Sequence, residues 1–246
     1  MGLCATCVHA RRIRSDRGAV FYLCALAATD PRFPKYPTLP VVACSGYAGM
    51  PRSVEFFESQ FQRQVQAQEF ALNPFERLSL EYIQGTVLDL GCGLGNLALE
   101  AARRGCSVTA IDASPTAIER IRKAAQSQRL AVEAVEANLA DFQIGRDYDT
   151  IVAIGLLMFF PQARALAFLE DIQARIRPGG RAVVNGLIEG TTYMDMFTPG
   201  EYYLFRREEL ADRFAGWAME LMRYDNFPAP GNTLKSFATV IARKPD

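Results

Sequence analysis

The chain has 246 residues, of which 50% are hydrophobic and 22% charged, which suits a globular protein and excludes an extensively disordered or fibrous one. This length allows one full α/β domain and a smaller accessory element. Lysine and arginine together number 27, as do aspartate and glutamate, so no net positive charge favours a nucleic acid or an anionic membrane as partner.

The chain has no uninterrupted apolar run of about 18 residues, the length that a membrane span needs. Its first residues, MGLCATCVHARRIRSD, contain no apolar segment of the kind found in signal peptides. We therefore expect a cytoplasmic protein that neither crosses nor binds a membrane.

Residues 1–50 are rich in cysteine, proline and arginine and are predicted to form a compact, loop-dominated module. Four of the six cysteines lie in it: Cys4, Cys7, Cys24 and Cys44. Because the cytosol keeps thiols reduced, clustered cysteines in such a protein more often bind a metal or react than form disulfides. Four thiolates match the tetrahedral coordination of structural zinc, so these four are predicted to be zinc ligands that stabilise the module.

The cysteine spacing fits a regular zinc ribbon only in part. A ribbon repeats the C-x2-C pair of Cys4 and Cys7, whereas Cys24 and Cys44 are single. An iron–sulfur cluster, replacement of one ligand by His9, and a set of unligated packing cysteines therefore stay open as alternatives.

Residues 51–246 are predicted to form the main domain. The segment 51–84 has helical spacing with a break near Asn73 and Pro74, which predicts two helices. From Gly85 onward, short apolar runs rich in β-branched residues alternate with helical stretches. This alternation predicts an α/β fold with a doubly wound, mainly parallel seven-stranded sheet. A turn is expected at Pro178 to Gly180, and residues 188–235 are predicted to contain the substrate lid.

A glycine-rich loop follows the first strand of this domain, in the string VLDLGCGLGNLALEAA. Asp89 ends the strand, and Gly91, Gly93 and Gly95 follow at alternate positions around Cys92. Glycine permits positive φ and close approach of the backbone to a ligand, at the strand end where doubly wound sheets bind ligands. The string therefore predicts a nucleotide-cofactor site, although a plain turn with Asp89 as a helix cap is the simpler alternative.

Two cofactor classes compete for this loop. A dinucleotide fingerprint also begins with G-x-G but needs a third glycine or alanine where this chain has Asn96. The carboxylate of Asp89 would repel a pyrophosphate, whereas it would attract the α-amino group of a methionine moiety. Asp89 and Asn96 thus favour S-adenosylmethionine over NAD.

The later strands add further candidate cofactor residues at their carboxyl ends. Asp112, followed by Ala113, ends the second strand, where a carboxylate can accept hydrogen bonds from ribose hydroxyls. Asn138 and Leu139 follow the third strand, where an amide can bind the adenine edge and an aliphatic chain can pack on its face. Gly155 follows the fourth strand and completes the predicted set.

The motifs D-x-G-C-G-x-G at Asp89 to Gly95 and A-I-D-x-S at Ala110 to Ser114 resemble those of class I S-adenosylmethionine-dependent methyltransferases. The resemblance covers roughly residues 85–186. Beyond it, LLMFFP, PGG, FRREELADRFAGW and FATVIARK resemble the tellurite-resistance methyltransferases of the TehB type. This closer resemblance implies that Phe159 follows the strand beneath the methyl group and that a lid helix begins at Arg206 and Glu209 and ends at Trp217.

One segment departs from that family. TehB-type enzymes carry a histidine and an arginine before the last strand, where this chain has NFPAPGNTLKSF. The segment offers Asn226, Asn232 and Lys235 but no imidazole, because His9 is the only histidine of the chain. Specificity for tellurite or selenite therefore does not follow from the resemblance.

The acceptor site is expected in the aromatic segment EGTTYMDMFTPGEYYLFRR after the fifth strand, with Tyr193, Tyr202 and Arg206 as candidate substrate residues beside Phe159 and Trp217. Packing of the lid onto the core is the alternative role for these aromatic side chains. A sulfonium donor is already activated, so no general base is needed for a soft or ionised acceptor.

We therefore expect a methyltransferase acting on a thiol, a chalcogen oxyanion or a carboxylate as its small-molecule partner. The alternatives are a methyltransferase or an S-adenosylmethionine sensor that acts on a macromolecular partner docked by the cysteine module, and an NAD-dependent oxidoreductase.

Overall fold

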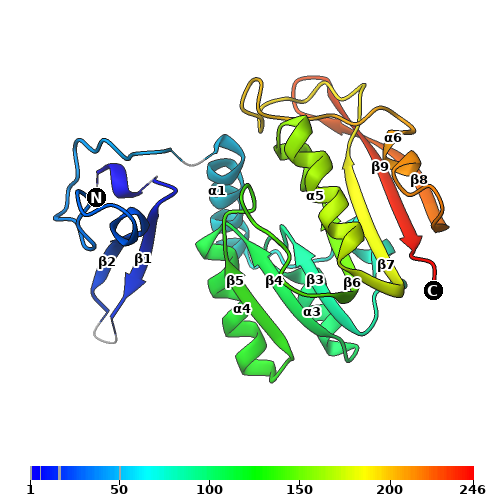
Figure 1. Cartoon of the computed structure of the whole chain (residues 1–246), viewed down its shortest axis with the longest axis horizontal. Helices are drawn as coiled ribbons and strands as arrows, with labels where there is room; N and C mark the ends of the chain where they lie inside the picture. Colours follow the sequence, from blue (N-terminus) through cyan, green and yellow to red (C-terminus); the bar gives the residue numbers. More distant parts are fainter. Residues whose placement is uncertain (1, 6, 16–17, 50) are drawn as a thin grey trace. The chain divides into compact units, whose positions relative to one another are not determined.

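The computed structural model describes residues 2–5, 7–15, 18–49 and 51–246. The chain divides into two compact units, Met1–Pro51 and Arg52–Asp246. The division lies one residue beyond the boundary that the composition predicts. Each unit has its own secondary structure (Figure 1).

The first unit contains a two-stranded antiparallel sheet, β1 (Ala10–Arg14) and β2 (Val20–Cys24), and two 3-10 helices, η1 (Leu3–Ala5) and η2 (Ala25–Ala28). Tyr22 is the one side chain that is buried among the described residues of this unit. The segment after η2 has no helix or strand in the described range, as its prolines predict. This unit therefore has almost no hydrophobic core.

The second unit is built on a seven-stranded sheet, which confirms the predicted fold class. Its strands are β3 (Thr86–Leu90), β4 (Ser107–Asp112), β5 (Val132–Glu136), β6 (Tyr148–Ile154), β7 (Ile176–Leu187), β8 (Ala218–Ala229) and β9 (Thr233–Arg243). Their order across the sheet is β5-β4-β3-β6-β7-β9-β8. The first five of these strands pair in parallel, whereas β9 runs antiparallel to both β7 and β8.

The sequence provides side-chain caps for two of the helices of this unit. The helices are α1 (Arg52–Ala67), α2 (Pro74–Ser79), α3 (Asn96–Arg103), α4 (Pro115–Gln128), α5 (Gln162–Ala174) and α6 (Glu209–Asp212), with a 3-10 turn η3 (Leu157–Phe159). Asn73 and Glu76 form a capping box at the start of α2, and Ser114 caps α4 ahead of Pro115. Capping thus explains the predicted break between α1 and α2.

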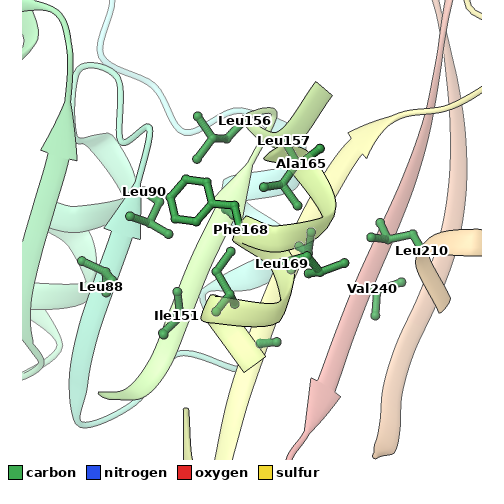
Figure 2. Close-up of a cluster of buried hydrophobic side chains, with 14 of the residues drawn as sticks. Leu88, Leu90, Ile151, Leu156, Leu157, Ala165, Phe168, Leu169, Leu210 and Val240 are labelled. Atoms are coloured by element: carbon green, nitrogen blue, oxygen red, sulfur yellow. The ribbon is translucent and has the colours of Figure 1, made fainter. Parts of the chain in front are cut away.

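The strands bury side chains on both faces, so the unit has a core on each side of its sheet. Leu88 and Leu90 of β3 join one cluster with Phe168 and Leu169 of α5 (Figure 2). Val87, the residue before Leu88 in β3, faces the cluster on the opposite side of the sheet, which contains side chains of α3 and α4. This double burial produces the continuous apolar runs from which the parallel sheet is predicted.

Two local predictions are wrong. The residues from Pro178 to Gly180 lie inside β7 rather than in a turn before it, and they form an irregularity there: Gly179 has a positive φ of 71° and the register of the pairing with β6 shifts. The predicted lid helix is shortened to Glu209–Asp212, and the chain continues in turns to Gly216, whose φ is 85°. Trp217 therefore ends no helix.

In the described part of the chain, no helix combines the length and apolar character that a membrane crossing requires.

Phe168→Ala should lower the free energy of unfolding by about 3 to 5 kcal/mol, because Phe168 is fully buried and its removal leaves a cavity. Urea unfolding of the full chain measures this change. Met219→Ala is the control, since the Met219 side chain on β8 is 41% exposed and should cost less than about 1 kcal/mol. Equal losses in the two variants would contradict the assigned core.

Candidate functional site

The glycine loop between β3 and α3 turns over the end of the neighbouring strand β4. The amides of Gly91 and Cys92 both donate to the carbonyl of Ile111, at 2.8 and 3.0 Å. Gly91, Gly93 and Gly95 all have positive φ. A Cβ on Gly95 would lie 2.4 Å from the side chain of Ile121, so only glycine fits between this loop and α4.

Asp89 is the most unusual group of this loop. Its side chain is 4% exposed, and its Oδ2 has no hydrogen-bond partner among the described residues. Burial, followed by the negative charges of Glu76 and Asp112, raises the pKa of Asp89 to about 8. A buried carboxyl oxygen without a partner is costly, which indicates that a donor from outside the chain belongs there.

Asp112 lies close to this loop and helps to fix it. Its Oδ2 accepts from the amide of Gly93 at 2.9 Å, and its Oδ1 accepts from the amide of Ser114 at 2.8 Å. Burial raises the pKa of Asp112, although these bonds and a further one from the amide of Ala113 oppose the rise. Each carboxylate oxygen can accept a second hydrogen bond, so Asp112 can also bind hydroxyl donors.

The remaining candidate cofactor residues follow the ends of β5 and β6. The amide of Ala137 bonds to the carbonyl of Asp112 at 3.0 Å, which carries the chain past β4 toward Asn138. Asn138 is exposed and its Oδ1 accepts from Ala140, whereas Leu139 is buried in the core. Gly155 has a φ of 65° and bonds through its amide to the carbonyl of Asn185. Because β3 to β6 are parallel neighbours, these groups lie along one edge of the sheet.

Cys92, within the loop, is buried, and burial raises the pKa of its thiol well above the ordinary value. The thiol therefore stays protonated at neutral pH, which agrees with a packing role rather than a nucleophilic one.

Helix α1 supplies contacts that sequence reasoning missed. A Cβ placed on Gly93 would lie 3.1 Å from the ring of Phe61, so this ring covers the glycine loop. Glu58 accepts hydrogen bonds of 2.5 Å from the hydroxyls of both Ser114 and Thr116 at the start of α4. Helical spacing predicted the helix itself, but no local signal in the sequence paired Glu58 with Ser114.

A row of aromatic rings extends from α1 across the carboxyl edge of the sheet. The ring of Phe57 lies 5.9 Å from Phe61 and 5.4 Å from Phe159, centroid to centroid. Phe197 follows at 5.1 Å from Phe159, and Tyr202 at 5.0 Å from Phe197. The structure thus brings Phe159 and Tyr202, two of the candidate substrate residues, into one apolar wall.

Tyr193 belongs to the same cluster and carries a cation. The Nζ of Lys235, on β9, lies 4.5 Å from the centroid of the Tyr193 ring. Burial lowers the pKa of Lys235, and its ammonium group makes no ion pair with a carboxylate of the described residues. Lys235 is therefore a partly desolvated positive charge beside the aromatic wall.

The other two candidate substrate residues do not join this group. The side chain of Arg206 is 75% exposed and approaches Glu209 at 3.7 Å. Trp217 precedes Ala218, which pairs with Arg243 at the amino-terminal end of β7, the edge opposite the glycine loop. The lid helix that would carry Trp217 back to the glycine-loop edge does not form, so its substrate role stays a prediction that this position does not favour.

A surface hollow of about 760 Å³ lies away from these residues, between α3 and α4 and next to Val65 and Phe70. It does not include Asp89 or Asp112 in its lining, so we do not assign it to the cofactor.

The four predicted metal ligands are free thiols in the structure. Within the ranges 2–5, 7–15, 18–49 and 51–246, no group of three or more His, Cys, Asp or Glu side chains is placed so that it could hold a metal ion. Zinc coordination therefore stays a prediction.

Comparison with known proteins identifies the class of this domain. Residues 87–180 match a family model described as a methyltransferase domain. The chain is 30% identical to Hemagglutinin 1 of Eikenella corrodens over 64% of this chain and 54% of that protein. It is also 30% identical to the carboxy-S-adenosyl-L-methionine synthase of Vibrio atlanticus (strain LGP32), over 54% of this chain and 58% of that protein. The chain spans about half the length of these curated relatives.

Among solved structures, TehB from Haemophilus influenzae has the same fold. The match has a TM-score of 0.62 at 18% sequence identity and covers 96% of this chain and 87% of that one. Together, the matched residues, the sheet order and the glycine loop show that residues 87–180 belong to an S-adenosylmethionine-dependent methyltransferase domain, which is an enzyme domain.

Asp89→Asn should change how stability depends on pH in the cofactor-free chain. The pKa of Asp89 rises from 3.8 to about 8 on folding, so the folded carboxyl keeps a proton that the unfolded one loses. The free energy of unfolding should therefore fall as pH rises from about 4 to about 8, by up to about 1.4 kcal/mol per pH unit. Asparagine cannot titrate, so urea unfolding should find the variant more stable than the parent at pH 8 and similar at pH 4. Identical pH slopes would contradict this assignment.

Proposed function

We propose that this chain transfers the methyl group of S-adenosylmethionine to a small soft or anionic acceptor. The observation that carries the proposal is the buried Oδ2 of Asp89, which has no partner among the described residues and stands at the start of the glycine loop. A cationic α-amino group in this position would both donate a hydrogen bond and stabilise the ionised carboxylate.

The other groups at this edge fit the remaining parts of the cofactor. Asp112 has spare acceptor capacity for ribose hydroxyls, and the exposed Asn138 can bind the adenine edge. Gly93 and Gly95 let the backbone come close to a ligand, which no residue with a Cβ would allow there. When bound, S-adenosylmethionine supplies an electrophilic methyl group on a cationic sulfur.

The acceptor class is inferred from Lys235 and the aromatic wall beside it. A half-buried ammonium group with no ion-pair partner in the described chain favours a ligand of negative charge. The rings of Phe159, Phe197 and Tyr202 supply an apolar surface that excludes water from such a ligand. A thiolate, a chalcogen oxyanion or a carboxylate combines the two properties.

The chain's own residues contribute mainly orientation and exclusion of water. No histidine lies in the second unit, and an ionised acceptor requires no proton transfer to a base. Holding the acceptor in line with the methyl group can then supply much of the rate, up to about 7 to 11 kcal/mol of the barrier.

A methyltransferase acting on a macromolecular partner is the second candidate. It is favoured by exposed apolar side chains in the first unit. This unit holds six of the eight large exposed hydrophobic residues of the described chain: Ile13, Phe21, Tyr36, Leu39, Val42 and Tyr47.

A screen that follows release of S-adenosylhomocysteine with thiols, selenite, tellurite and small carboxylic acids separates the small-molecule acceptor from the macromolecular one. Turnover of none of them, with transfer of labelled methyl to protein in a cell extract, would favour the second candidate.

Titration calorimetry tests the cofactor. We expect S-adenosylhomocysteine to bind and NAD not to, and we expect Asp89→Asn to weaken the binding at least about tenfold because the carboxylate partner of the amino group is lost. Asp147→Asn is the control, since Asp147 is more than half exposed and pairs only loosely with Arg175. Binding of NAD alone would refute the proposal.

Lys235→Gln tests the acceptor site, using the best acceptor from the screen. We expect the KM for an anionic acceptor to rise at least about tenfold, while affinity for S-adenosylhomocysteine stays unchanged. Lys123→Gln is the matched control, because Lys123 is exposed on α4 and pairs with Glu119. An unchanged KM in Lys235→Gln would exclude Lys235 as the anion-binding group.

A further inference from the structure

The backbone of the first unit brings three of its cysteines together. The amide of Leu3 bonds to the carbonyl of Val41 at 2.7 Å, and the amide of Val8 bonds to the carbonyl of Ala48 at 2.9 Å. Cys7 itself forms an antiparallel bridge with Gly49. The segment that carries Cys4 and Cys7 therefore lies along residues 41–49, which carry Cys44.

The fourth cysteine is brought to the same end by the β1–β2 hairpin. Cys24 ends β2 and pairs with Ala10, the first residue of β1. The amide of Ala10 in turn donates to the carbonyl of Cys7 at 3.0 Å, and the amide of Ala25 donates to the backbone carbonyl of His9. Cys24 thus stands beside the turn that leads out of the C-x2-C pair.

The four thiols are available to a ligand. All four side chains are partly exposed and free, so they are accessible to a metal ion. As placed, they do not form a group that could hold a metal among the described residues, so binding has to draw the sulfurs inward to about 2.3 Å from the ion.

The first unit also needs a stabilising element. It has about 50 residues, and Tyr22 is the one buried side chain in its described part. Units of this size without a core usually require disulfides, a metal or a partner for stability. Its only cysteines are the four that the backbone gathers at one end.

We propose that Cys4, Cys7, Cys24 and Cys44 bind one Zn²⁺ as four thiolates and that this ion stabilises the first unit. Binding releases the protons of the thiols that are protonated beforehand, with no change in oxidation state. Four sulfur ligands leave no open position on the ion, so the site is structural and takes no part in methyl transfer.

Metal analysis of the reduced, full-length chain, purified without chelator and then supplied with ZnCl₂ and desalted, tests the proposal. We expect about one zinc ion per chain in the parent and less than about one fifth of that in Cys24→Ser and Cys44→Ser. Cys106→Ser is the matched control, because Cys106 lies in the second unit, and it should retain the parent's zinc. Cys24→His should keep more zinc than Cys24→Ser, since imidazole can replace one thiolate.

Hydrogen exchange on the same samples provides a second readout that does not depend on a variant folding. Removal of zinc with a chelator should accelerate exchange of amides in residues 2–49 at least about tenfold and leave α5 unchanged. Zinc near zero in the supplied parent, equal zinc in the parent and Cys24→Ser, or iron with visible absorbance in place of zinc would each overturn the proposal.

Discussion

The burial of Asp89 is the constraint on which the site depends. A carboxyl group is placed at the end of a central parallel strand, where the surrounding core excludes water and Asp112 and Glu76 add negative charge. The glycine loop can adopt its path only because positive φ is available at alternate positions beside that group. The protein therefore keeps a costly, unpaired acceptor at the point where a cationic ligand would compensate it.

Much of the fold and of the candidate cofactor site could be predicted from the sequence because both depend on local sequence patterns. The strands that end at Asp89 and Asp112 are short apolar runs, and the glycines between them lie at fixed spacing, so fold class and cofactor edge follow from pattern alone. Capping explains why the start of α2 was also predictable, since Asn73 lies immediately before Pro74.

The errors and omissions have a common physical cause, which is dependence on tertiary contacts. The stretch that ends at Trp217 has helical spacing, yet it forms only one short helix because it packs as turns before β8. Glu58 accepts a hydrogen bond from Ser114, which lies 56 residues further along the chain. The ammonium group of Lys235 lies over the ring of Tyr193, which belongs to a different segment. Sequence alone shows such side chains but not their partners, and for the same reason cysteine spacing suggests metal ligands without fixing their geometry.

The position of α1 has a consequence for exchange kinetics. Phe61 covers Gly93, and Glu58 fastens the same helix to the start of α4 through two short hydrogen bonds. A ligand that contacts the glycine loop would therefore lie beside a helix that is held in place at both points. We expect the residence time of such a ligand to depend on how often α1 moves away from the loop, so that release of product competes with chemistry as the step that limits turnover.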